Sequence, residues 1–148
     1  MELQKLNIEH VLFLDIETVP EYASFEDLDE TKQQLWTEKT KYIRKDEHSP
    51  ADFYPRAGIW AEFGKIVCIS VGFLSLKDGI RNFRLKTFWG EEKSILIDFS
   101  SLLNEHFSKP YHLLCAHNGK EFDFPFIARR MIIPVSYTHL RAHETVLD

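Results

Sequence analysis

The stretch VLFLDIETVP, residues 11–20, sets two carboxylates at the end of an apolar run. The run is short and closes at Pro20, which predicts a buried central strand over residues 11–16. Because strand side chains alternate, Asp15 and Glu17 are expected on one face and Ile16 on the other. A divalent cation would relieve the repulsion between the two acids. A simpler interpretation stays open, in which Asp15 ends the strand and Glu17 lies in solvated loop.

Composition sets the class of protein. The chain has 148 residues, 44% of them hydrophobic, and a net charge of −5, which indicates one soluble domain and argues against a broadly basic nucleic-acid coat. No apolar run approaches the ~20 residues that span a bilayer, so we expect no membrane partner. Cys68 and Cys115 lie in apolar runs without metal-ligand spacing, which predicts buried free thiols and a cytoplasmic location.

Residues 21–60 are expected to form a helical insertion. Charged residues dominate up to Asp46, and apolar residues recur at helical spacing, which predicts a buried face made of Leu28, Leu35, Trp36, Tyr42 and Ile43. The Pro-, Gly- and aromatic-rich stretch SPADFYPRAGIWAEFG, residues 49–64, is expected to be a loop.

The remaining elements define the fold class. KIVCISVGFLSL and IRNFRLKTF, separated by Lys77-Asp78-Gly79, predict a β-hairpin. A helix is expected after Glu91, with Ile95, Phe99, Leu102, Leu103 and Phe107 on its packed face. YHLLCAH predicts a short strand, and residues 121–131 a helix. This order predicts an α/β protein with a mixed sheet flanked by helices.

A second polar cluster lies in AHNGKEFDFPFIARR, residues 116–130. Asn118-Gly119 permits a tight turn with positive φ, and Asp123 stands where a helix begins. Asp123 could simply cap that helix, with Pro125 tolerated in its first turn. Core packing explains Phe122 and Phe124 at least as well as base stacking does. The adjacent arginines, Arg129 and Arg130, fit a solvated helix face or a phosphate contact equally well.

LDIET followed by HNGKEFDFPFIARR resembles the first two motifs of the DEDD superfamily of 3′–5′ exonucleases, most closely the predicted exonucleases related to the proofreading domain of family B DNA polymerases. The resemblance covers roughly residues 8–133 and implies an RNase H-like fold. It implies that Asp15, Glu17 and Asp123 supply three of four acidic ligands for two divalent metals, Mg²⁺ or Mn²⁺. The implied reaction is two-metal hydrolysis at single-stranded or frayed 3′ ends of DNA or RNA, with Thr18, Asn118 and Phe122 contacting substrate.

The end of the chain departs from this family. The third motif, which brings the fourth acid, should lie well beyond residue 133. His143 and Asp148 match its H-x-x-x-x-D spacing but arrive too soon, and a separation of five places them about 140° apart on a helix. PVSYTHLRAHETVLD resembles a recurrent spurious tail. We therefore expect a partial exonuclease domain over residues 1–134 that is incomplete at its C-terminus. Residues 135–148 are expected to be a non-native tail in which Tyr137 and His139 have no role. This chain is expected to show little or no exonuclease activity.

Two alternatives come from other classes of function. A haloacid-dehalogenase-type phosphatase also ends an apolar strand with closely spaced acids, although Glu17 replaces its second Asp. A non-catalytic module that binds nucleic acid through the same cleft is the other.

Overall fold

The computed structural model describes residues 6–44 and 47–143, with side chains described up to residue 133. Its contacts divide the chain into two compact units: residues 1–17 with 66–148, and residues 18–65. No helix within the described ranges is long and apolar enough to cross a membrane.

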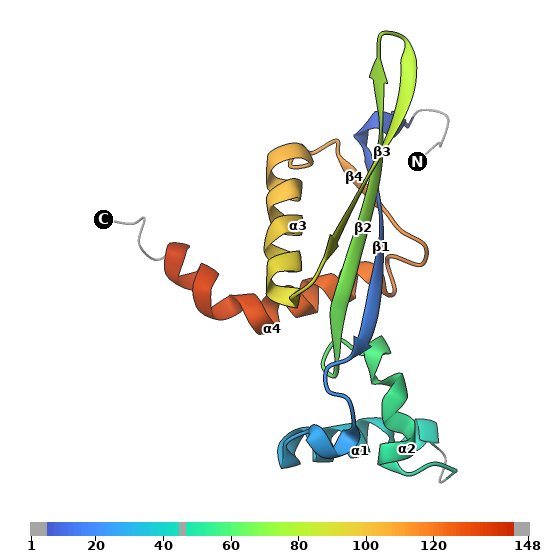
Figure 1. Cartoon of the computed structure of the whole chain (residues 1–148), viewed down its shortest axis with the longest axis vertical. Helices are drawn as coiled ribbons and strands as arrows, with labels where there is room; N and C mark the ends of the chain where they lie inside the picture. Colours follow the sequence, from blue (N-terminus) through green and yellow to red (C-terminus); the bar gives the residue numbers. More distant parts are fainter. Residues whose placement is uncertain (1–5, 45–46, 144–148) are drawn as a thin grey trace. The chain divides into compact units, whose positions relative to one another are not determined.

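The first unit is built on a four-stranded sheet in the order β3-β2-β1-β4. The strands are β1 (Val11–Pro20), β2 (Gly64–Lys77), β3 (Ile80–Trp89) and β4 (Leu113–Cys115). β1 pairs with β4 in parallel and β2 pairs with β3 antiparallel, which makes the sheet mixed as predicted. β1 and β2 run in opposite directions in Figure 1. β1 is preceded by a short 3₁₀ turn, η2 (Ile8–His10).

The turn of the β2–β3 hairpin follows from its sequence. Asp78 and Gly79 both have positive φ, 54° and 77°, the combination that a two-residue type I′ turn requires. The predicted hairpin is therefore confirmed, with both strands slightly longer than expected.

Two helices, α3 (Glu92–His106) and α4 (Asp123–His143), complete this unit. Figure 1 shows α3 alongside the hairpin and α4 crossing the lower end of α3. Glu91 caps α3 by accepting hydrogen bonds from the backbone N–H groups of Lys93 and Ser94. The buried core of this unit comes from the three long strands and both helices: Val11, Leu12, Leu14, Ile16, Ile66, Ile69, Val71, Phe88, Ile95, Leu96, Phe99, Phe126 and Ile127.

The second unit contains α1 (Glu30–Arg44), α2 (Pro50–Phe53) and the 3₁₀ turns η3 (Phe25–Asp27) and η4 (Tyr54–Ile59). Its core is largely aromatic and consists of Leu28, Trp36, Phe53, Tyr54, Ala57 and Phe63, with Phe25 and Trp60 packed against it. Trp36 is completely buried, and its indole N–H donates to the carbonyl of Pro50 at 2.8 Å.

Three sequence-based expectations were wrong in detail. Leu35, Tyr42 and Ile43 are exposed (57%, 86% and 52%), so α1 buries a different face, that of Trp36 and Thr40. Residues 50–59 form α2 and η4 rather than a loop, because Ser49 caps α2 through hydrogen bonds with Asp52 and Pro50 is tolerated in the first turn. The free thiols are less buried than expected, since Cys115 is exposed and Cys68 half-buried.

Candidate active site

The end of β1 presents its side chains as the sequence predicts. Leu14 and Ile16 are buried, at 5% and 6% exposure. Asp15 and Glu17, which alternate with them, are exposed. Strand geometry therefore directs both carboxylates to the solvent-facing side of β1.

The segment between β4 and α4 sets the position of Asp123. Asn118 adopts the left-handed conformation (φ 53°), and its carbonyl accepts hydrogen bonds from the backbone N–H groups of Glu121 and Phe122, both at 3.0 Å. At Gly119 a Cβ atom would lie 2.6 Å from the Cβ of Ala116 and 2.8 Å from the ring of Phe124, so only glycine fits. α4 then begins at Asp123 itself.

Asp123 is a buried carboxylate, with 2% of its surface exposed. Burial raises the pKa of Asp123, and the nearby charge of Asp15 raises this pKa further. The backbone N–H groups of Asp123 itself and of Ile16 in β1 lower the pKa, as does His117. Asp123 is therefore placed beside the end of β1, which a simple helix cap would not require.

Of the three predicted ligands, the structure thus brings Asp15 and Asp123 into electrostatic contact. Glu17 does not complete the group: within the described part of the chain, no three His, Cys, Asp or Glu side chains come together to hold a metal ion.

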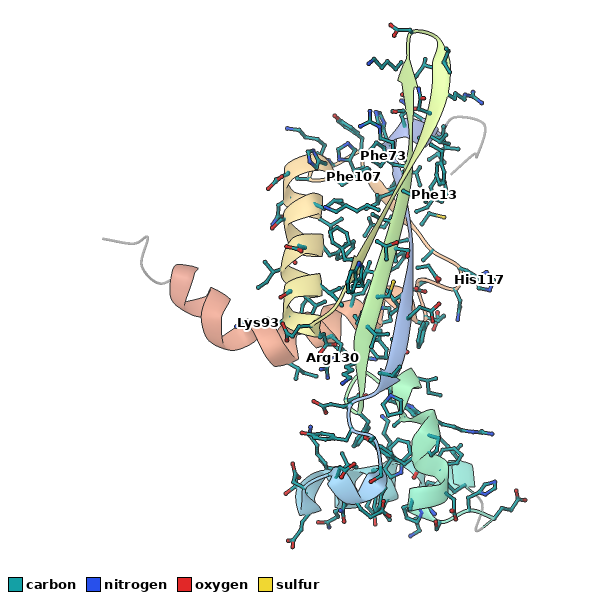
Figure 2. All side chains as sticks on the ribbon, viewed as in Figure 1. Phe13, Phe73, Lys93, Phe107, His117 and Arg130 are labelled. Carbon is teal, nitrogen blue, oxygen red and sulfur yellow. The ribbon has the colours of Figure 1, made fainter. Side chains whose placement is uncertain are left out.

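The predicted substrate contacts lie in different surroundings. Asn118 is exposed, whereas Phe122 is half-buried with its ring 5.5 Å from that of Phe126. Phe122 therefore packs against the α4 core at least in part, as the simpler interpretation expected. Thr18 belongs to the second unit. Figure 2 shows His117, whose charge acts on Asp123, in the segment between β4 and α4.

The expectation for Arg130, a solvated side chain or a phosphate contact, was wrong. Arg130 is 3% exposed, and its guanidinium donates two hydrogen bonds to the carboxylate of Glu92, one from Nε at 2.9 Å. Glu92 also accepts the backbone N–H of Ile66 at 2.7 Å. Figure 2 shows Arg130 where α4 passes the start of α3. Arg129, in contrast, is exposed.

This ion pair holds α4, and with it Asp123, against α3 and β2. Sequence reasoning missed it because the partners are 38 residues apart and no local pattern links them. The predicted tail residues cannot be compared in the same way, since the side chains of Tyr137, His139 and His143, and all of Asp148, lie outside the described residues.

Comparison with known protein families matches residues 57–148 to RNase_H_2, of the RNase H superfamily. The chain belongs to this superfamily, and the mixed sheet with flanking helices is the RNase H-like α/β fold. No curated protein and no solved structure matches the chain.

Members of the RNase H superfamily are nucleic-acid hydrolases that generally use divalent metals. The donors at the end of β1 suit such a metal chemically, because carboxylate oxygens are the ligands that Mg²⁺ and Mn²⁺ prefer. A cation would also offset the repulsion between Asp15 and the buried Asp123. The described residues do not by themselves form a group of three ligands for a metal ion.

Proposed function

We propose that the chain carries most of the domain of a metal-dependent 3′–5′ exonuclease of the DEDD type, related to the proofreading domains of family B DNA polymerases. Its substrates are single-stranded or frayed 3′ ends of DNA or RNA, and its products are nucleoside monophosphates. Membership of the RNase H superfamily supports the nuclease class. The order of the motifs LDIET and HNGKEFD supports the finer assignment.

One observation carries the proposal: the carboxylate of Asp123 is buried and lies close enough to Asp15 for the charge of Asp15 to raise its pKa. A protein gains no stability from placing a buried acid beside a second acid, since burial and repulsion both oppose ionisation. An arrangement that is unfavourable for the fold and favourable for a cation is typical of a functional site.

The proposed roles follow from position. Asp15 and Asp123 would hold the cation, and Glu17, on the same face of β1 as Asp15, would supply a third carboxylate. Bound Mg²⁺ or Mn²⁺ lowers the pKa of water and stabilises the departing 3′ oxygen. Thr18, Asn118 and Phe122 are proposed to contact the terminal nucleotides. Asn118 is exposed at the turn where this contact would occur.

The proposal includes the extent of the domain. The exonuclease domain corresponds to residues 1–134, with the fourth acid supplied by native sequence that follows it, and residues 135–148 are a non-native tail. Removal of one member from a set of groups that acts together costs most of its activity. The 148-residue chain is therefore proposed to turn over slowly or not at all, and its natural compartment is the cytoplasm.

The test uses a 5′-labelled oligonucleotide and the gene product in which native sequence continues past residue 134. With Mg²⁺ or Mn²⁺ the substrate should shorten stepwise from its 3′ end, with release of nucleoside monophosphates. Asp15→Ala should abolish the reaction, whereas Asp98→Ala, a matched change at an exposed acid in α3, should not. Internal cleavage of a 3′-blocked substrate would show that the protein is an endonuclease rather than the proposed exonuclease.

The same assay separates the alternatives. Binding of the oligonucleotide without any cleavage would favour the non-catalytic module. Release of inorganic phosphate from a small monoester would favour the phosphatase, for which the superfamily assignment offers no support.

A further inference from the structure

The outer face of β3 carries a row of side chains that the proposed site does not use. Residues of β3 alternate, and the pairing Gly72↔Leu85 and Ser70↔Thr87 places Arg81, Phe83, Leu85, Thr87 and Trp89 on one face. Two observations confirm this face. The hydroxyls of Ser70 and Thr87 lie 3.1 Å apart, and the rings and methyls of Phe83 and Leu85 cover Gly72, where a Cβ would lie 2.6 Å from Phe83. We call this row the β3 face.

The β3 face is apolar and exposed. Phe83, Leu85 and Trp89 keep 56%, 74% and 79% of their surface in solvent. The opposite face of the strand is the one that serves the core, since Phe88 is 5% exposed and its ring packs 6.3 Å from that of Phe99 in α3. Core packing within the described residues therefore does not account for the aromatic residues of the β3 face.

The charged residues of β3 itself are all positive although the chain is acidic overall. On the core-facing side of the strand, Arg84 and Lys86 line a pocket together with Asp98 and Glu105 of α3. β3 (IRNFRLKTFW) contains Arg81, Arg84 and Lys86 and no carboxylate, whereas the whole chain carries −5. Among the residues that the structure describes, none of these three forms an ion pair. Lys86 instead lies 4.6 Å from the centroid of the Phe88 ring. β3 is also an edge strand, so cations on both of its faces can reach a ligand lying along that edge.

We propose that the β3 face binds a single strand of nucleic acid, with bases stacked on Phe83 and Trp89 and phosphates contacted by Arg81 on the same face. Arg84 and Lys86, on the opposite face, contact phosphates only where the nucleic acid passes along the edge of β3. Exposed aromatic rings beside unpaired cations are the features that sequence-tolerant strand binding requires. A protein segment docked on the same row would bury Arg81, which forms no ion pair among the described residues, and burying an unpaired charge is costly.

The position of the β3 face suits a strand that leads to the acids. Phe83 and Trp89 are six residues apart on one face, which corresponds to roughly 20 Å of strand. β1 and β3 both run opposite to β2, so the Trp89 end of β3 and the Asp15 end of β1 point the same way (Figure 1). This inference rests on the proposed nucleic-acid substrate, because it assigns the path by which the strand approaches the site.

The first test measures binding in the absence of cleavage. Fluorescence anisotropy of a labelled oligothymidylate is recorded with the 148-residue chain in EDTA. Phe83→Ala and Trp89→Ala should each weaken binding about tenfold, because one stacked base is lost in each case. Tyr42→Ala, a matched change at an 86%-exposed aromatic residue in α1, should leave the affinity unchanged. Equal affinity of all three variants and the wild type would overturn the proposal.

The second test separates stacking from phosphate contacts. Arg81→Gln should reduce the slope of log K against log salt by about 0.7, the value for one phosphate contact to a single strand. Lys41→Gln, at an exposed cation of α1, should leave the slope unchanged. An unchanged slope for Arg81→Gln would remove this residue from the proposed surface.

The fluorescence of Trp89 also reports oligonucleotide binding directly in the wild-type protein, without a variant that could be destabilised. This fluorescence should be quenched when oligothymidylate is added, and Trp89→Phe should abolish the quenching while keeping the affinity within a few-fold. If no quenching occurs, or if Trp89→Ala instead dissociates a dimer of the chain without affecting oligonucleotide binding, the proposal fails. If the gene product that continues past residue 134 is inactive with metal while this binding persists, the proposed function is refuted and the inference about the β3 face stands.

Discussion

The buried carboxylate of Asp123, at the start of α4, lies beside the backbone N–H of Ile16 in β1, which lowers the pKa of Asp123. Two motifs that lie far apart in the sequence therefore meet at this point. This arrangement also brings the Asp123 carboxylate close to Asp15, where burial and like charge both oppose its ionisation.

The first prediction concerns pH and the stability of the metal-free protein. Because burial raises the pKa of Asp123, the stabilising contribution of its protonated form is fully present below the ordinary unfolded pKa of about 3.9 and is lost as pH rises through the folded pKa. Asp123→Asn removes the charge and keeps an acceptor oxygen. Relative to the wild type, this variant should therefore gain stability from acidic to neutral pH.

Urea denaturation in EDTA at several pH values measures this difference. The exposed Asp98→Asn serves as a control, for which we expect little change across the series. A difference between Asp123→Asn and wild type that stays constant with pH would contradict the explanation.

The second prediction concerns the Glu92–Arg130 pair, whose side chains are 11% and 4% exposed. Arg130→Ala leaves the half-buried carboxylate of Glu92 without its cation and should lower the free energy of unfolding by about 3–5 kcal/mol. Arg129→Ala, one position away and exposed, should change it by less than about 0.5 kcal/mol. Similar losses from the two variants, measured by urea denaturation, would show that the pair does not hold α4.

The third prediction compares two glycines. Gly119→Ala forces a Cβ to within 2.6 Å of the Cβ of Ala116 and should cost about 1–3 kcal/mol, with displacement of the turn that carries Asn118. Gly79→Ala has no atom within 4 Å but a φ of 77°, so it should cost only the backbone strain, about 1–2 kcal/mol. The measurement that distinguishes them is metal binding, which Gly119→Ala should weaken and Gly79→Ala should not.

The fourth prediction tests which face of α1 is buried. Trp36→Ala removes a fully buried ring and should cost about 3–5 kcal/mol, whereas Leu35→Ala, at a 57%-exposed neighbour, should be nearly neutral. Circular dichroism during urea denaturation follows both variants without relying on tryptophan fluorescence. A larger loss of stability for Leu35→Ala than for Trp36→Ala would show that α1 buries the face predicted from the sequence.

Local sequence patterns were sufficient to predict the strands of the sheet and the shared face of the two acids of β1. Strand alternation predicted that Asp15 and Glu17 share a face, and Asp78-Gly79 predicted the hairpin, because both features depend on residues adjacent in sequence. The alternation of the β3 face was equally readable in IRNFRLKTFW.

Features that depend on tertiary partners could not be predicted in this way. Helical spacing predicted that Leu35 and Tyr42 are buried. The core is formed by aromatic residues beyond α1, and these pack against Trp36 instead. Thr40 is buried although polar, because its hydroxyl donates to the carbonyl of Trp36 at 2.7 Å and accepts from Arg44 at 2.9 Å. The pairing of Arg130 with Glu92 likewise has no signal in a single sequence.

Direct titration with Mn²⁺, followed by the loss of its free electron paramagnetic resonance signal, tests the central claim that Asp15 and Asp123 hold a divalent cation. The wild-type chain should bind Mn²⁺ at one saturable site that Mg²⁺ displaces, and Asp15→Asn and Asp123→Asn should each abolish that site while Asp98→Asn retains it. Equal binding by wild type and both site variants, or no binding by the wild type through the millimolar range, would contradict the account.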